Sequence, residues 1–192
     1  MNRKITINDI IPIEEYSKTR NKRRSEINLV KKNRRIYVGP FITFYFENFH
    51  TMLYQIQEML FIEKGDSNQA HEEIEAYNSL VPLDNELIAT VMIEIDNESK
   101  RYLELRKLSG IENSINISSN SEKFISEALS DEERTKPDGK TSAIHFIKFK
   151  TNDAFFKNME DRSQDIIISI NHPEYNHSTN ISYETRLSLI KN

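Results

Sequence analysis

Residues 37–60 read Y-V-G-P-F-I-T-F-Y-F-E-N-F-H-T-M-L-Y-Q-I-Q-E-M-L, and the spacing of their apolar residues changes within this short stretch. Ile42, Phe44 and Phe46 alternate with other residues, which is the period of a half-buried strand. From Thr51 to about Lys64 the apolar residues follow helical spacing and predict a helix. The polar residues 47–51 therefore form a hinge. A helix start offers free N–H groups and partial positive charge, so such a hinge can bind a ligand.

The sequence before this stretch predicts a basic helix over about residues 12–33. Pro12 suits a first helical turn, and Glu14 and Glu15 suit the positive end of the helix dipole. Basic residues at 31–35 suit the opposite end. Arginine occupies two positions of the otherwise apolar stripe on this helix, at Arg20 and Arg23.

The remaining pattern indicates a mixture of strands and helices. The clearest strand is Leu87–Ile95, whose alternate residues are apolar. Further expected elements are an edge strand at 3–7, a helix at 69–79, an acidic helix at 122–134, a turn at 136–139, strands at 143–149 and 166–170, a loop carrying His172 and His177, and a helix at 183–191. This order predicts an α+β fold with a single, mostly antiparallel sheet and helices packed over it, in one globular domain spanning residues 1–192.

Composition excludes several chemistries. The chain has no cysteine, which rules out a disulfide framework, a thiol nucleophile and a cysteine-ligated cluster or zinc. Its four glycines do not form a dinucleotide-binding or P-loop fingerprint. No apolar stretch is long enough to span a bilayer, and the pattern of the first residues leads us to expect no secretory signal. We therefore expect a cytoplasmic protein without a membrane partner.

The net charge of −4 hides a strong segregation. Residues 1–38 hold eleven Lys/Arg and four Asp/Glu, a balance of +7, whereas the remainder has a balance of −11. Such a split marks either a nucleic-acid or partner surface, or a basic segment that lies on the acidic body of the same protein. The internal match is favoured, because the basic residues share their helix with apolar ones.

The hinge supplies the first candidate site residues. Glu47, Asn48 and His50 would assemble with Gln55, Gln57 or Glu58 from the following helix. Of these three, Gln55 and Glu58 share a helical face and Gln57 points elsewhere. The alternative is purely local: Asn48 or Thr51 caps the free amides of the helix and Glu58 is solvated.

The two arginines of the basic helix supply the second candidate. A guanidinium on an apolar helix face must find a carboxylate, a phosphate or water. One outcome is a salt bridge within the chain, for which the candidate carboxylates are Glu47, Glu58, Glu86 and Glu94. The other is an anion site formed by Arg20, Arg23 and Arg24.

The histidines supply the third group of candidate site residues. His172 lies in an H-P-E-Y-N-H segment with Glu174, and His145 lies in the middle of a strand. No His and Glu spacing matches a known metal motif, so no metal site is predicted and His145 is interpreted as a packed strand residue.

Several blocks together resemble a known family. These are G-P-x-x-T-x-x-F-E-N-x-x-T-x-x-x-Q-I-Q-E-M-L, then E-x-E-A-Y-N-x-L-x-P, E-L-x-A-T-x-x-I-E-I, A-I-H-F-I-K-F and I-N-H-P-x-Y. The chain is similar to an uncharacterised bacterial family of unknown function, over nearly its whole length. Genes of this family often lie beside those of rubrerythrin and of a heterodisulfide-reductase-type iron–sulfur oxidoreductase. The resemblance thus implies a redox or oxidative-stress context.

The leading hypothesis is an accessory or binding protein that works beside such iron-containing partners. Its ligand would sit in one pocket, formed by the hinge, the arginines and the segment 172–175. The candidate residues are Arg20, Arg23, Glu47, Asn48, Gln55, Glu58, His172 and Tyr175.

Two other classes of function stay open. One is a metal- or carboxylate-dependent enzyme with a His/Glu site, in which Glu47 and Glu58 act with His172. The other is a nucleic-acid binder through the basic helix, which lacks interleaved aromatic residues.

Overall fold

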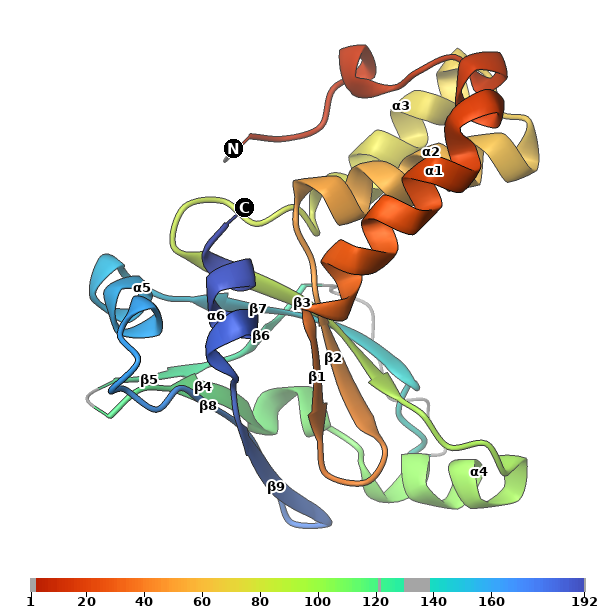
Figure 1. The fold of residues 1–192 in the computed structure, drawn as a ribbon. Helices are drawn as coiled ribbons and strands as arrows, with labels where there is room; N and C mark the ends of the chain where they lie inside the picture. Colours follow the sequence, from red (N-terminus) through yellow and green to blue (C-terminus); the bar gives the residue numbers. More distant parts are fainter. Residues whose placement is uncertain (1–2, 121, 130–138, 192) are drawn as a thin grey trace.

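The structure, a computed structural model, describes residues 3–120, 122–129 and 139–191, and these residues form an α+β fold (Figure 1). The helices are α1 (Ile13–Lys32), α2 (Phe49–Glu63), α3 (Ser67–Asn78), α4 (Glu98–Lys107), α5 (Asp153–Glu160) and α6 (Tyr183–Ile190), with short 3₁₀ turns at Ile7–Asp9 (η1) and Ile111–Ser114 (η2). None of these helices combines the length and the apolarity that a membrane crossing needs.

The strands form two antiparallel sheets, so the prediction of a single sheet was wrong. One sheet has the order β1-β2-β3-β7-β6 and the other β5-β4-β8-β9. The strands are β1 (Arg35–Val38), β2 (Ile42–Phe46), β3 (Glu86–Ile93), β4 (Ile115–Ser118), β5 (Lys123–Ile125), β6 (Glu127–Ala128), β7 (Ile144–Lys150), β8 (Ile167–His172) and β9 (Tyr175–Asn180). Local alternation marks a strand, but it does not say which sheet the strand joins.

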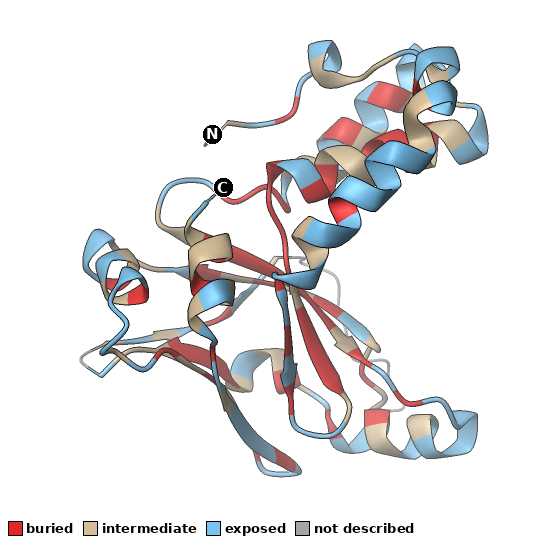
Figure 2. Cartoon of the chain, viewed as in Figure 1, coloured by how far each residue is buried: buried red, intermediate tan, exposed pale blue. Residues whose placement is uncertain are grey.

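The main hydrophobic core joins the two sheets. Phe44 and Phe46 on β2 share a face with Ala89 and Val91 on β3, because the register pairs Phe44 with Val91 and Phe46 with Ala89. Ile168 on β8 belongs to the same core. Figure 2 shows the buried residues concentrated along these strands. Burying each large apolar side chain contributes roughly 1.5–3 kcal/mol.

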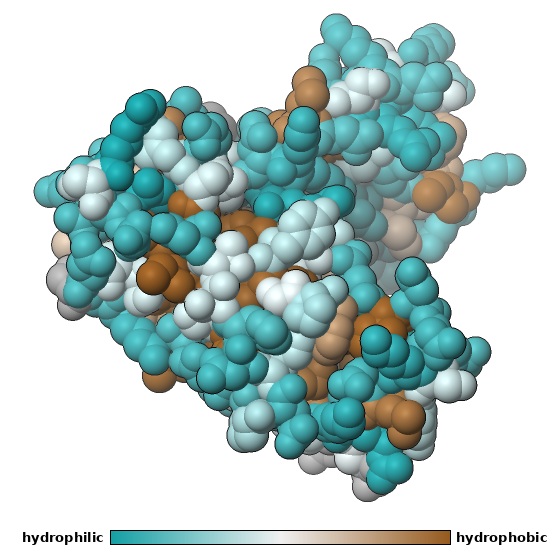
Figure 3. Space-filling model, turned by 60° about the horizontal axis from the view of Figure 1, so that its bottom comes forward, coloured by the Kyte–Doolittle hydropathy of each residue, from teal (hydrophilic) through white to brown (hydrophobic). Residues whose placement is uncertain are grey.

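A second core lies where α2, α3 and the N-terminal residues pack together beside Ile88 of the first sheet, and Figure 1 shows α1–α3 grouped at one end of that sheet. Ile56 and Leu60 of α2 pack with Ile74 of α3 and with Ile88, which points away from the main core. The predicted basic helix is confirmed as α1, which buries Tyr16 and Ile27 and exposes most of its polar residues. Figure 3 shows hydrophilic residues over most of one face of the molecule, interrupted by separate hydrophobic patches.

Residues 3–12, which include the η1 turn, run beside the helices, and we call them the strap. The edge strand expected at 3–7 is absent from the structure. Two side-chain amides take the place of a neighbouring strand: Gln57 bonds both backbone groups of Ile11, each at 3.0 Å, and Asn78 bonds both of Ile5, at 2.8 and 2.9 Å. Ile5 is buried beneath, so the strap is fixed by its backbone and by one apolar anchor.

Three further expectations in the second half of the chain need comment. The acidic helix expected at 122–134 is wrong for the described part, where β5 and β6 lie, because Phe124 packs on Phe155 of α5 and β5 pairs with β4. The loop expected around His172 and His177 is instead the β8–β9 hairpin. The turn predicted at 136–139 lies outside the described residues except for Gly139.

We predict that Gln57→Leu loosens the strap. The change removes two hydrogen bonds and leaves the N–H and C=O of Ile11 without their partner, which should destabilise the protein by about 2 kcal/mol. Urea unfolding measures the loss, and hydrogen exchange at the Ile11 amide shows where it arises. Gln55→Leu, two residues earlier on another face of α2, is the matched control. Equal stability and equal Ile11 exchange in both variants would contradict the clamp.

Candidate functional site

The hinge between β2 and α2 has a well-defined local geometry. Asn48 is the N-cap of α2: its side-chain oxygen accepts a bond from the Thr51 amide, and the Thr51 hydroxyl accepts one from the Asn48 amide, both at 2.9 Å. These bonds satisfy two backbone donors at the helix start. Asn48 therefore has the local capping role that was the alternative to a ligand contact.

Glu47 is the central polar residue of the hinge. Its side chain is buried, at 9% exposure, and each carboxylate oxygen accepts one hydroxyl bond. Thr51 of α2 donates at 2.7 Å and Thr90 of β3 donates at 2.8 Å. A helix and a neighbouring strand thus hold one carboxylate in a fixed orientation.

Arg34, which sequence analysis considered only as a cation near the end of the basic helix, stabilises the same hinge. It is 2% exposed and donates to three main-chain carbonyls, at Phe46 (2.9 Å), Glu47 (2.9 Å) and Ser188. Burial lowers the pKa of Arg34 to about 10, while the negative charge of Glu47 acts in the opposite direction. The guanidinium therefore stays charged at neutral pH.

These groups border a cavity of about 390 Å³, which we call the hinge pocket. Its floor is the helix-facing side of the first sheet, and its walls are the first turns of α2, the end of α3 and the α1–β1 junction. The lining residues are Lys31, Arg34, Arg35, Tyr45, Phe46, Glu47, Thr51, Met52, Gln55, Tyr77, Leu80, Thr90, Met92, Ile144 and Phe146. Of the predicted site residues, Glu47 and Gln55 meet here.

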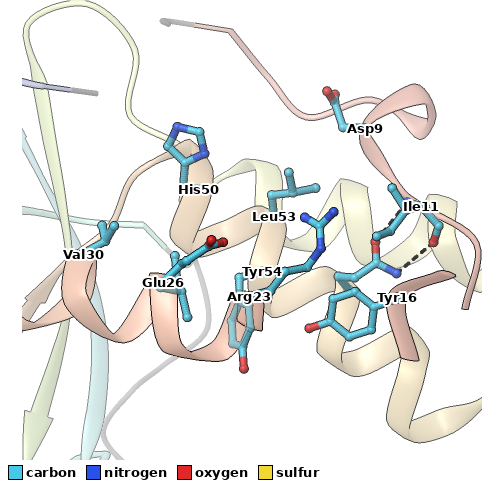
Figure 4. Close-up of a pocket in the computed structure, with 11 residues that line it drawn as sticks. Asp9, Ile11, Tyr16, Arg23, Glu26, Val30, His50, Leu53 and Tyr54 are labelled. Atoms are coloured by element: carbon cyan, nitrogen blue, oxygen red, sulfur yellow. Dashed lines mark hydrogen bonds between the residues drawn. The ribbon is translucent and has the colours of Figure 1, made fainter. Parts of the chain in front are cut away.

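A second cavity, of about 210 Å³, lies under the strap, and we call it the strap pocket. Figure 4 shows Arg23 and Glu26 reaching it from α1, His50 and Leu53 from α2, and Asp9 from the strap. Arg23 donates to the Thr19 hydroxyl at 3.0 Å. Because α2 separates the two cavities, Arg23 and Glu47 do not share a pocket.

Arg20 and Glu58 form the salt bridge that the sequence analysis offered as one outcome. The guanidinium binds both carboxylate oxygens at 2.8 Å, and the Tyr16 hydroxyl donates to the same carboxylate at 2.5 Å. The Arg20 hydrogen bonds hold the pKa of Glu58 below its usual value, and burial opposes them. Burial raises the pKa of the Tyr16 hydroxyl, and its hydrogen bond to Glu58 adds to that rise while it helps to lower the pKa of Glu58.

His172 and Tyr175 lie in the second sheet and border neither pocket. The Nε2 atom of His172 is 3.2 Å from the carbonyl oxygen of Ser109. The Tyr175 hydroxyl donates to the carbonyl of Val38 at 2.8 Å. It also lies where a side chain at Gly39 would be, 2.5 Å from the position of a Cβ atom, so the β1–β2 turn needs glycine there. His172 thus connects β8 to the segment before η2, and Tyr175 connects β9 to β1.

The single pocket expected from the sequence is therefore divided. Glu47 and Gln55 meet at the hinge pocket, Arg23 reaches the strap pocket, and Arg20 with Glu58 forms a separate ion pair. Among the described residues no group of three or more His, Asp and Glu side chains is placed to hold a metal ion.

Comparison with known protein families and solved structures shows which family the chain belongs to. A family model described as "Protein of unknown function (DUF3501)" matches residues 4–192. The chain belongs to the DUF3501 family. Its fold is similar to a crystal structure at 1.90 Å of a "novel protein of unknown function" from Burkholderia pseudomallei K96243, with a TM-score of 0.89, 32% sequence identity and 98% of each chain covered. No curated protein matches the sequence.

Membership of DUF3501 confirms the resemblance to an uncharacterised family that the sequence blocks indicated. The first of those blocks spans the β1–β2 turn, the hinge and α2, which together carry both pockets. Both findings are described only as proteins of unknown function, so for this DUF3501 chain the pockets themselves carry the information on function.

We predict that Glu58→Gln flattens part of the pH dependence of stability in this DUF3501 chain. A carboxyl whose pKa is lower in the folded state stabilises above its unfolded pKa, near 4.5, and loses that contribution as the pH falls below it. The variant should be less stable than the parent at pH 7, with the gap closing below pH 4.5. Chemical denaturation across pH measures this gap. Glu72→Gln on α3 is the control, and a gap that stays constant with pH would contradict the assignment.

Proposed function

We propose that this protein is a cytoplasmic accessory protein that binds a small ligand in the hinge pocket and works in a redox or oxidative-stress context. The observation that carries the proposal is the buried Glu47 carboxylate at the border of a cavity of about 390 Å³. A carboxylate can accept roughly four hydrogen bonds, and only one bond to each oxygen comes from the described residues. Acceptor capacity therefore remains for a bound molecule.

Two further groups on the pocket wall support ligand binding. The Gln55 amide and the Tyr77 hydroxyl border the cavity, and neither makes a side-chain hydrogen bond to another described residue. Both can donate and accept, so both can orient a ligand. Fixed polar groups among mostly apolar walls are typical of small-molecule sites.

The redox context rests on the family resemblance and not on the pocket. That resemblance implies neighbouring genes for rubrerythrin and for an iron–sulfur oxidoreductase. We propose the products of these genes as the partners. The chain has no cysteine and so cannot hold an iron–sulfur cluster in the usual way. It would act on its partners by binding, with any electron transfer carried by them.

The two alternative functions gain less support from the contacts. In the His/Glu enzyme hypothesis Glu47, Glu58 and His172 act together, yet each is engaged by different partners on different elements. For nucleic-acid binding, α1 exposes Lys18, Lys22 and Arg24, but the only aromatic residue within α1, Tyr16, is buried. Base stacking on this helix thus has no platform.

We predict that small metabolites perturb the hinge pocket. A metabolite library titrated into ¹⁵N-labelled protein should shift the amide signals of Gln55 and Thr90, and Glu47→Gln should weaken the best binder at least tenfold by removing the buried charge. Glu26→Gln, which changes a carboxylate of the strap pocket, is the matched control. A library that produces no shifts at the hinge, or whose best binder ignores Glu47→Gln, would refute the ligand-binding function.

A separate prediction concerns the partners. Tagged protein at its natural expression level should recover a rubrerythrin-like protein or an iron–sulfur oxidoreductase after mild crosslinking, identified by mass spectrometry. The exposed cations of α1 make an acidic partner surface the electrostatic match, so recovery should fall in Lys18→Glu/Lys22→Glu. Recovery of a monomer free of redox proteins at cellular concentration would contradict the redox role.

A further inference from the structure

We propose that the ligand of the hinge pocket is a flat organic anion: a ring that carries an N–H donor at one end and a carboxylate or phosphate at the other. This inference rests on the proposed function and adds the chemical class of the ligand. The evidence comes from two cations at the rim, from the apolar walls and from the carboxylate at the back of the pocket.

The rim cations are Lys31 and Arg35. The Lys31 ammonium lies 5.3 Å from the centre of the Tyr54 ring, and the Arg35 guanidinium lies 4.7 Å from the centre of the Tyr45 ring. Arg35 also donates to the Tyr37 hydroxyl at 3.2 Å. Neither cation forms an ion pair within the part of the chain that the structure describes, whereas Arg20 and Lys148 each do. Tyr45 lines the hinge pocket and holds the Arg35 charge there, whereas Tyr54, the ring beside Lys31, lines the strap pocket. Neither ring neutralises its cation.

The charge balance of the pocket favours an anion. Its lining residues include three cations, Lys31, Arg34 and Arg35, and one carboxylate, Glu47. Arg34 and Glu47 are buried near one another and offset each other's charge. The two rim charges remain, and a carboxylate or phosphate would meet them with charge-assisted hydrogen bonds.

The walls favour a flat apolar body. Phe146, Met92 and Ile144 form a continuous apolar surface on adjacent strands, since the register places Met92 opposite Ile144 and Thr90 opposite Phe146. Met52 of α2 and Leu80, which follows the end of α3, also border the cavity. A cavity of about 390 Å³ is at the small end of the range for ligand sites, roughly 300–1,000 Å³. One or two fused rings match this space.

The N–H donor follows from Glu47. Hydroxyl bonds from Thr51 and Thr90 fix its carboxylate and leave further lone pairs, which only a donor can use. A buried acceptor facing a purely apolar ring would lose hydration without compensation. A ring N–H, as in an indole or a purine, avoids that cost.

Four probes of similar shape separate these elements. Indole-3-acetate carries both the N–H and the charge, 1-naphthaleneacetate lacks the N–H, indole-3-acetamide lacks the charge, and indole-3-ethyl phosphate replaces the carboxylate with a phosphate. Binding is measured by titration of ¹⁵N-labelled protein, with the shifts at Gln55 and Thr90 as the site readout. The test variant is Lys31→Gln/Arg35→Gln. Its matched control is Lys18→Gln/Lys32→Gln, which removes two exposed charges of α1 that do not line the pocket.

The expected result is that indole-3-acetate or its phosphate analogue binds at least tenfold tighter than both the amide and the naphthalene acid. In Lys31→Gln/Arg35→Gln the advantage of the acid over the amide should disappear while amide binding persists, which shows that the pocket is intact. The carboxylate and phosphate arms identify the preferred anion. Equal binding of acid and amide at the hinge would overturn the anion while the ligand-binding function stands. Equal or tighter binding of the naphthalene acid would overturn the N–H donor. If none of the probes perturbs the hinge although metabolites in the library do, the ligand class is wrong; if the library also fails, the function fails with it.

Discussion

The guanidinium of Arg34 is the interaction on which the hinge depends. It binds the last carbonyl of β2, the carbonyl of Glu47 and, 154 residues away in sequence, that of Ser188 near the end of α6. Carbonyls that lie between a strand and a helix have no ladder partner, and leaving them buried without a donor would cost about 1–3 kcal/mol each. A single planar cation satisfies the two hinge carbonyls, of Phe46 and Glu47, and also binds the Ser188 carbonyl within α6. Lysine offers only a point charge on a flexible stem, so it would not reproduce this fork.

Arg34 fixes the hinge and thereby the direction of α2. That direction determines which segments lie against each face of α2. Gln55 and Gln57 are two residues apart and therefore point to different faces of the helix. Gln57 clamps the backbone of the strap, whereas Gln55 borders the hinge pocket and its amide bonds no other side chain or carbonyl among the described residues. The same residue type thus has a structural role on one face and a candidate binding role on the other, and only the position of the neighbouring segments distinguishes them.

Whether a feature of the fold or of the site could be predicted depends on how far apart in the sequence the interacting residues lie. The change from strand to helix at 37–60, the basic helix and the strand near 87–95 depend on local spacing, and the structure confirms all three. The cap formed by Asn48 and the ion pair of Arg20 also use residue types that permit few alternatives. The division into two sheets could not be predicted, because it depends on which distant strands pair, as β4 does with β8. Arg34 was missed for the same reason: its third partner is Ser188.

The distribution of charge shows how long-range contacts change the meaning of a sequence pattern. An internal match between the basic N-terminal segment and the acidic body was favoured, yet among the described residues of α1 only Arg20 forms an ion pair with another element. A salt bridge between exposed groups contributes little, so folding supplies weak pressure to pair the remaining cations. Their positive charge is left for solvent at Lys18, Lys22 and Arg24, and for the rim of the hinge pocket at Lys31 and Arg35. Charge that does not stabilise the fold raises the local concentration of anions near the surface, which favours association with an anionic ligand or an acidic partner.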